Sequence, residues 1–251
     1  TDNDYEGSLE HPKPDEGDVE FLLRAVNRFF KIDLGFDDVA GAYGGVRPLI
    51  SEGDPKKSVD ISRRAELYET SSGMITITGG KLTTWRRMAQ MVVDRLVERE
   101  FREAPCRTHE IPLGHPVEVD QLPEVAGVTP DSREHLAARY GLFAERIMEM
   151  CAESPKLAEP ILPGMPDLLV EAVVAARYEQ ARRVADVLLR RTRLGLLTAR
   201  TLVSDKDAVR RVAEAMAGDL GWNRRRVKRE ADAWGEAAEA EGLVVSEPAV
   251  G

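Results

Sequence analysis

The sequence has 251 residues, of which 43% are hydrophobic and 31% charged, and this composition excludes a disordered or collagen-like chain. Its net charge of −9, from 35 basic and 44 acidic residues, argues against a nucleic-acid partner. No run of 18 apolar residues occurs, so the sequence predicts no membrane-spanning helix. Cys106 and Cys151 form no Cys-x-x-Cys pair, which favours free thiols over a disulfide or a metal site.

The first predicted element is an amphipathic helix over residues 17–30. Its apolar side chains recur at the i, i+3, i+4, i+7 spacing of one helix face. The small-residue segment 38–47 follows and is predicted to form a strand that ends before Pro48.

A β-hairpin and a helix are predicted next. Residues 64–70 and 74–78 read as strands, and Ser71-Ser72-Gly73 between them has the composition of a turn. Gly79-Gly80 follows the second strand, and from Leu82 the apolar period changes to that of a helix. The order is therefore strand, glycine turn, helix.

The remaining chain is predicted to be helical after a junction over residues 102–128, which contain four prolines and no clear period. Thr129-Pro130 has the composition of a helix start, with an N-cap residue followed by proline. The predicted helices span 129–140, 143–151, 167–191, 205–220 and 223–240. These patterns divide the chain into an α+β part over 1–103, an all-helical domain over 104–246 and a tail over 247–251.

Basic residues are concentrated late in the chain. Residues 177–229 hold fifteen basic and six acidic side chains. One interpretation is a set of solvated helix faces with ion pairs such as Arg182 with Asp186. The other is a surface patch for anionic lipid or a partner subunit. The sequence leaves both open.

The glycine turn is the strongest candidate for a binding site. Glycine allows the backbone to approach a ligand closely, and the first N–H groups of a helix have no partner within it. Lys81 stands in this first turn, where the helix dipole opposes a cation by about 0.3–1 kcal/mol. A bound anion or an anionic reduced cofactor would offset that cost. A plain tight turn is the alternative.

These residues resemble those of a known family. Gly79-Gly80-Lys81-Leu82-Thr83-Thr84-Trp85-Arg86 is similar to the last cofactor-contacting turn of the FAD-dependent, quinone-linked glycerol-3-phosphate dehydrogenases. Further segments that resemble this family, in the same order, are Thr1-Asp2, Gly44 to Leu49, Ser62-Arg63-Arg64, Cys106 to Gly114, Arg190 to Gly195 and Gly221-Trp222. The matches extend over nearly the whole chain.

The resemblance implies a fold. Residues 1–103 would be the α+β remainder of an FAD- and substrate-binding domain, followed by an all-α C-terminal domain. The family begins with a Gly-x-Gly-x-x-Gly turn that holds the FAD pyrophosphate, and this motif is absent from the sequence. We therefore expect a C-terminal portion that lacks the N-terminal FAD-binding Rossmann half. That half would be its partner, and the chain alone would be inactive.

The resemblance also implies an activity, the oxidation of sn-glycerol 3-phosphate to dihydroxyacetone phosphate with FAD as cofactor. Electrons would pass to quinone. The protein would be cytoplasmic, would bind peripherally to the inner face of the cell membrane and would form a homodimer. One alternative is a glycerol-3-phosphate oxidase that uses oxygen. A second, from a different class, is a non-enzymatic helical interaction module.

The resemblance assigns candidate site residues. Arg47 and Lys81 would be catalytic, and together with Arg63 they would bind the substrate. The expected flavin contacts are Gly80, Lys81, Leu82 and Thr83. Ordinary surface positions remain the alternatives for Arg47, at a strand end, and for Arg63, in a loop. No metal site is expected, and the general base is expected in the N-terminal half.

Overall fold

The computed structural model describes residues 5–46 and 64–244. The chain forms two compact units, and each is considered by itself. The helical unit contains residues 8–45 and 114–244 of the described chain. The hairpin unit contains residues 5–7, 46 and 64–113. The predicted boundary near residue 103 remains a prediction, and this division groups the first helix with the C-terminal helices.

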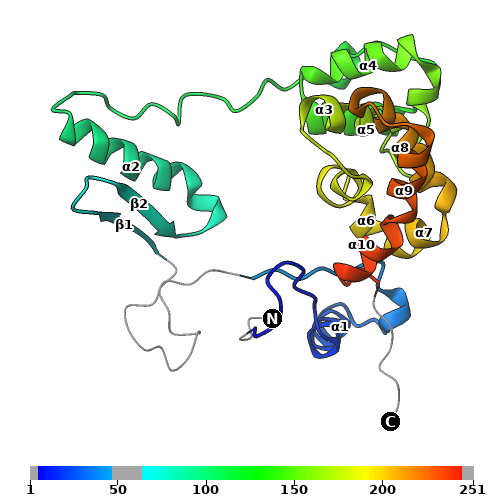
Figure 1. The fold of residues 1–251 in the computed structure, drawn as a ribbon, viewed down its shortest axis with the longest axis horizontal. Helices are drawn as coiled ribbons and strands as arrows, with labels where there is room; N and C mark the ends of the chain where they lie inside the picture. The colour runs from blue at the N-terminus through cyan, green and yellow to red at the C-terminus, as the bar shows by residue number, and fades with distance from the viewer. Residues whose placement is uncertain (1–4, 47–63, 245–251) are drawn as a thin grey trace. The chain divides into compact units, whose positions relative to one another are not determined.

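The hairpin unit contains the predicted hairpin, which is confirmed. Strands β1 (Ala65–Glu69) and β2 (Ile75–Gly79) pair antiparallel, with Leu67 opposite Ile77. A 3-10 turn, Leu82–Thr84, leads into α2 (Trp85–Arg99), which packs against both strands (Figure 1). The predicted change of period at residue 82 therefore marks a real helix start.

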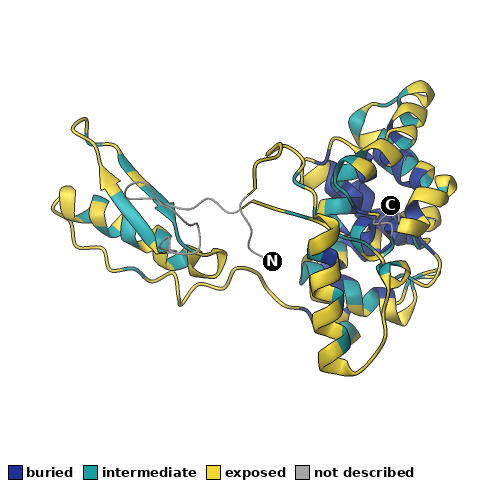
Figure 2. Ribbon diagram, turned by 90° about the horizontal axis from the view of Figure 1, so that it is seen from below, coloured by how far each residue is buried: buried dark blue, intermediate teal, exposed yellow. Residues whose placement is uncertain are grey.

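The hairpin unit has little core of its own. None of the described residues 64–113 is buried, and Figure 2 shows this part in teal and yellow without dark blue. A two-stranded sheet is marginally stable by itself in water and normally needs more strands or packing. Local hydrogen bonds therefore carry much of the geometry of this unit.

The first helix of the helical unit is α1 (Glu16–Phe30), as predicted. The Asp15 carboxylate caps its start by accepting a hydrogen bond from the Asp18 amide. Of its apolar residues only Val19 is buried, whereas Phe29 is 80% exposed. The periodicity thus identified the helix, but its apolar face is largely uncovered in this chain.

The strand predicted over residues 38–47 is wrong in its described part. A 3-10 turn spans Phe36–Asp38, and no strand is assigned from there to residue 46. Arg200 donates hydrogen bonds to the carbonyl groups of Phe36 and Val39, and the Ala42 amide donates to the Leu243 carbonyl. A side chain of the C-terminal helical region and the backbone after its last helix therefore satisfy polar groups that a neighbouring strand would otherwise pair.

Helices α3 (Pro130–Tyr140) and α4 (Phe143–Glu153) confirm the next two predictions. The Thr129 hydroxyl accepts from the Ser132 amide, and Pro130 stands at the first helical position. Gly141 ends α3 with φ of 54°. Local capping chemistry thus fixed both ends of α3.

The single helix predicted over 167–191 is wrong. Helix α5 (Leu169–Tyr178) ends early, and a separate π-helical segment spans Asp186–Arg191. Gln180 adopts φ of 59°, and the Ala181 amide donates to the Ala175 carbonyl, which is a left-handed helix ending.

The C-terminal helices follow the π-helical segment in the chain, and α8 is the one that packs along α5. Their bounds are α6 (Leu194–Leu197), α7 (Ala199–Ser204), α8 (Lys206–Leu220), α9 (Arg224–Asp232) and α10 (Trp234–Ala240). Helix α8 confirms the prediction over 205–220, whereas α6 and α7 were not predicted. The helix predicted over 223–240 is divided at Ala233 into α9 and α10.

The core of the chain lies in the helical unit, where Figure 2 shows dark blue. One cluster of buried side chains includes Leu169, Leu188 and Met216, and α5 packs along α8 within it. A second cluster includes Leu136 and Ile147. In the described chain, no helix combines the length and the apolar character needed to cross a bilayer. The predicted helical C-terminal architecture with a small sheet before it is confirmed.

Candidate functional site

The glycine turn joins β2 to α2 through two left-handed residues. Gly79 has φ of 73° and Gly80 φ of 76°, a region that residues with a side chain rarely occupy. A Cβ atom at Gly80 would lie 2.5 Å from the Met88 sulfur. Glycine at residue 80 therefore permits both the turn and the close approach of α2 to it.

The turn presents polar groups to solvent. Lys81, Leu82 and Thr83 are all exposed, and Leu82 is 89% exposed. The amides of Leu82 and Thr83 open the 3-10 turn, where N–H groups have no acceptor within the helix. Among the described residues, no carboxylate forms an ion pair with Lys81. The turn thus contains one ammonium group and two adjacent amides, which are hydrogen-bond donors of the kind that suit an anion or a carbonyl oxygen.

The hydroxyl of Thr84 holds the backbone of this turn. Its Oγ1 atom accepts from the Lys81 amide at 3.2 Å and donates to the Lys81 carbonyl at 2.9 Å. The Thr84 amide donates to the same carbonyl at 2.9 Å. The Lys81 amide is thereby occupied, whereas the amides of Leu82 and Thr83 have no acceptor among the described residues.

The structure brings together four of the predicted site residues and leaves two untested. Gly80, Lys81, Leu82 and Thr83 are consecutive in the turn. Arg47 and Arg63 lie outside the described residues, so their predicted roles remain predictions.

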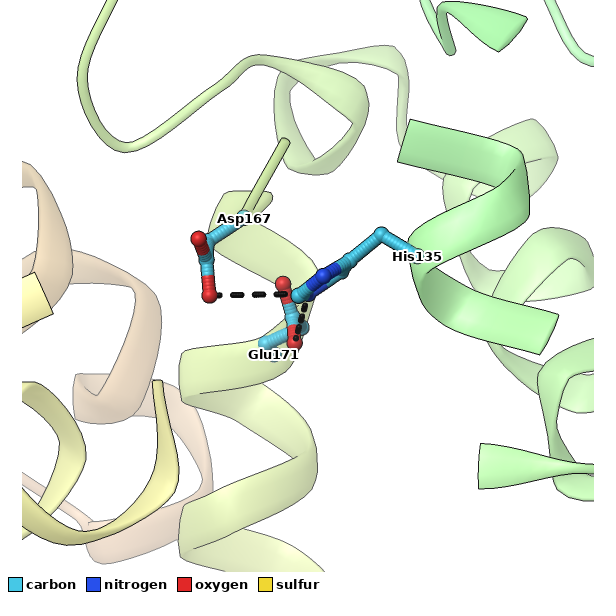
Figure 3. Close-up of side chains that lie close together, drawn as sticks. All are labelled: His135, Asp167 and Glu171. Atoms are coloured by element: carbon cyan, nitrogen blue, oxygen red, sulfur yellow. Dashed lines mark hydrogen bonds and ion pairs between the residues drawn. The ribbon is translucent and has the colours of Figure 1, made fainter. Parts of the chain in front are cut away.

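A buried charge cluster in the helical unit was not predicted from the sequence. It combines three side chains of α3 with two acids at the start of α5, and Figure 3 shows part of it. The members are His135, Arg139, Tyr140, Asp167 and Glu171. The side chain of Glu171 is 0% exposed and that of Asp167 3% exposed.

Arg139 is the central cation of this cluster. Its Nη1 atom lies 2.9 Å from Asp167 Oδ1 and 2.8 Å from Glu171 Oε1. Its Nη2 atom donates to the Thr192 carbonyl at 3.3 Å. Arg139 thus ties α3 to α5 and to the end of the π-helical segment.

The Glu171 carboxylate accepts hydrogen bonds from several neighbouring groups. Besides Arg139, His135 Nε2 lies 3.2 Å from Oε1 and the Tyr140 hydroxyl donates at 3.1 Å. The Leu168 amide donates to Oε2 at 2.8 Å. A buried carboxylate with this many donors is well compensated.

The surroundings shift the pKa values of the acids in opposite directions. Burial raises the pKa of Asp167, and the neighbouring charge of Glu171 raises it further. Burial would also raise the pKa of Glu171, but the hydrogen bond and charge of His135, together with Arg139, hold it below its usual value. Glu171 therefore loses its proton more readily than Asp167 does.

The remaining shifts also stem from this environment. Burial raises the pKa of Tyr140, and Glu171 adds to the effect. Burial would lower the pKa of Arg139, but Glu171 and Asp167 outweigh it and raise the value. The Tyr140 phenol therefore acts as a neutral donor to Glu171.

His135, Asp167 and Glu171 also have donor atoms that lie within 4.8 Å of one another, as a metal site requires. The Arg139 guanidinium, however, already bridges the same two carboxylate oxygens. It supplies the positive charge that a cation would bring. The cluster is thus a compensated structural connection between α3 and α5, with an arginine in the role of the cation.

The basic stretch 177–229 contains many internal pairs. Arg177 binds Asp219, Arg211 binds the Ile161 carbonyl, and Arg226 pairs with Glu230. For the predicted pair of Arg182 and Asp186, the structure shows that the Asp186 carboxylate accepts from the backbone amide of Arg182 instead. These contacts favour the solvated-face interpretation for part of the stretch.

Three exposed arginines of α9, by contrast, have no ion pair among the described residues. They are Arg224, Arg225 and Arg229.

Together the fold and the glycine turn define a helical C-terminal domain that is preceded in the chain by a strand, a glycine turn and a helix. The sequence pattern of the C-terminal domain of alpha-glycerophosphate oxidase matches residues 75–227. The chain belongs to this family. The match includes both the glycine turn and the buried cluster.

Curated relatives carry related names. Glycerol-3-phosphate dehydrogenase 2 of Mycobacterium tuberculosis is 33% identical over 99% of this chain and 43% of its own length. Glycerol-3-phosphate dehydrogenase 1 of the same organism is 37% identical over 78% of this chain and 39% of its own length. A glycerol-3-phosphate dehydrogenase of Synechocystis is 33% identical over 79% of this chain and 38% of its own length. The chain spans about two fifths of these relatives, and the resemblance seen in the sequence is confirmed.

Proposed function

We propose that this chain is part of an FAD-dependent oxidoreductase that converts sn-glycerol 3-phosphate to dihydroxyacetone phosphate. The observation that carries the proposal is the glycine turn, with Lys81 and the Leu82 and Thr83 amides at one exposed point inside the matched family region. The names of the relatives support the substrate.

The donor set of the turn fits the electron-rich edge of a flavin. Two adjacent N–H groups suit a carbonyl oxygen, and a lysine ammonium suits the negative charge that reduction adds. FAD, when bound, would accept the hydride from C2 of the substrate. The residues that would hold its flavin ring are Gly80, Lys81, Leu82 and Thr83.

The substrate needs cations as well, because glycerol 3-phosphate is largely a dianion near neutral pH. We assign Arg47 and Arg63 to this role, and Lys81 to the region between substrate and flavin. An arginine can hold two phosphate oxygens at once with its planar guanidinium. Lys81 would stabilise the alkoxide that develops as the C2 hydroxyl loses its proton.

The test is the kinetics of the longer flavoprotein that contains this sequence. We expect Lys81→Ala and Arg47→Ala each to lower kcat/KM at least about tenfold, roughly 1.4 kcal/mol of transition-state stabilisation. Arg87→Ala is the matched control, because it removes an exposed positive charge on α2, only six residues from Lys81. Residues 1–251 by themselves are expected to be inactive. Near-wild-type kinetics for both site variants would contradict the assignment.

Quinone is the proposed electron acceptor, and contact with the membrane would follow from it. The relatives are named dehydrogenases, which favours an acceptor other than oxygen. The exposed arginines Arg224, Arg225 and Arg229 are candidates for contact with anionic lipid at the inner face of the cell membrane. The matched family is named for an oxidase, which favours oxygen as the alternative acceptor. Stoichiometric peroxide formation during turnover would identify the oxidase.

A further inference from the structure

We propose that Thr84 is a positioning residue that acts through Lys81, by fixing the backbone from which the lysine side chain projects. This inference rests on the proposed function, because it concerns the same turn. Thr84 itself would touch neither substrate nor cofactor.

Packing does little to orient Lys81. Two glycines with left-handed backbones precede it, and glycine has the widest conformational freedom of any residue. Leu82 after it is almost fully exposed, and no described residue of the hairpin unit is buried. A lysine side chain is itself flexible. Local hydrogen bonds must therefore set its direction.

The Thr84 hydroxyl provides those bonds. It accepts from the Lys81 amide and donates to the Lys81 carbonyl, at 3.2 and 2.9 Å, so both backbone polar groups of Lys81 are held by one side chain. With these bonds Lys81 keeps an extended backbone, φ −121° and ψ 149°. A hydroxyl is suited to this double role because it is both a donor and an acceptor.

The neutral hydroxyl also preserves the charge of the turn. An aspartate at residue 84 could also accept from the Lys81 amide, but its carboxylate would lie beside Lys81 and compensate its ammonium. Threonine holds the same amide with a neutral hydroxyl and leaves the positive charge available to a ligand. The structure thus explains why a neutral side chain serves this turn.

The kinetic test uses the longer flavoprotein with glycerol 3-phosphate and an artificial dye. We expect Thr84→Val to lower kcat/KM about tenfold, mainly through kcat, and Thr84→Ser to stay within about threefold of wild type. Thr76→Val in β2 is the matched control, because it makes the same exchange at an exposed threonine outside the turn. In a variant that already carries Lys81→Ala, the additional exchange Thr84→Val should change kcat/KM little.

A second measurement tests the hydrogen bonds without activity. In residues 1–251, amide exchange of Lys81 measured by NMR should be at least about threefold faster in Thr84→Val than in wild type or Thr84→Ser. Unchanged exchange, unchanged kinetics of Thr84→Val, or additive effects of Thr84→Val and Lys81→Ala would each overturn the proposal. If the longer protein failed to oxidise glycerol 3-phosphate at all, the proposed function would fail, and amide exchange would still decide whether Thr84 holds Lys81.

Discussion

Replacement of Arg139 by methionine tests the buried charge cluster. Methionine keeps most of the side-chain volume but leaves Asp167 and Glu171, with 3% and 0% of their side chains exposed, without their main cation. Removal of one partner from a buried ion pair costs about 3–5 kcal/mol. Arg139 is 21% exposed, so water can partly replace it and the lower end, about 3 kcal/mol, is expected.

The assay is urea unfolding followed by circular dichroism. With a slope of about 1–3 kcal/mol per molar urea, a loss of about 3 kcal/mol moves the midpoint down by roughly 1–3 M. The matched control is Arg146→Met on α4. Its guanidinium lies 2.8 Å from Glu149 and 3.4 Å from Glu153, but this pair is exposed. Its replacement should therefore leave the midpoint close to that of the wild type.

A third variant separates charge from packing. Arg139→Met combined with Asp167→Asn and Glu171→Gln removes the uncompensated charges and should recover much of the lost stability. The reasoning would be refuted if Arg139→Met lowered the urea midpoint no more than Arg146→Met does. It would also be refuted if the combined variant were less stable than Arg139→Met.

Three further predictions concern other groups. Because the pKa of Asp167 is raised in the folded protein, its contribution to stability should fall as pH rises from about 4, the ordinary aspartate value, through the folded value. The stability of wild type relative to Asp167→Asn, from urea midpoints, should decline over that range; parallel curves would contradict this. Burial, with the charge of Glu171, raises the pKa of the Cys151 thiol to about 12, so iodoacetamide at pH near 8 should label the partly exposed Cys106 first and Cys151 only after unfolding. Equal labelling rates in the folded state would disprove that expectation. Gly80→Ala should cost about 1–2 kcal/mol of local stability, because alanine must adopt a left-handed backbone. Amide exchange in β2 should accelerate in this variant and not in Gly114→Ala, where the added Cβ meets open space.

Helices with local caps were predictable from the sequence. Thr129, Pro130 and Gly141 bound α3, and Asp205 and Gly221 bound α8, as their chemistry indicates. These signals lie within a few residues of the ends that they fix. Prediction succeeded where the determining contacts are local.

The break after α5 could not be found in this way. Val184, Val187 and Leu188 continue the apolar spacing of the helix and are buried, so the period gives no sign of an interruption. The break depends on a left-handed Gln180, a residue type that does not mark helix ends. Arg191, at the end of the π-helical segment, donates a hydrogen bond to the Glu179 carbonyl just after α5 and so connects the two segments.

The site shows the same contrast. The glycine turn is contiguous, so its residues could be identified together. The buried cluster joins α3 to residues about thirty positions later, and only tertiary packing brings them together. The sequence offered one sign of this cluster, the i, i+4 spacing of His135 with Arg139 and of Asp167 with Glu171. The two acids also stand beside an apolar run.

The most direct test of the proposed function is anaerobic reduction of the bound flavin by glycerol 3-phosphate in the longer protein. The flavin absorbance should bleach rapidly in the wild type and in Arg87→Ala, and at least about tenfold more slowly in Lys81→Ala. Absence of bleaching in the wild type, or an equal rate in Lys81→Ala, would contradict the account.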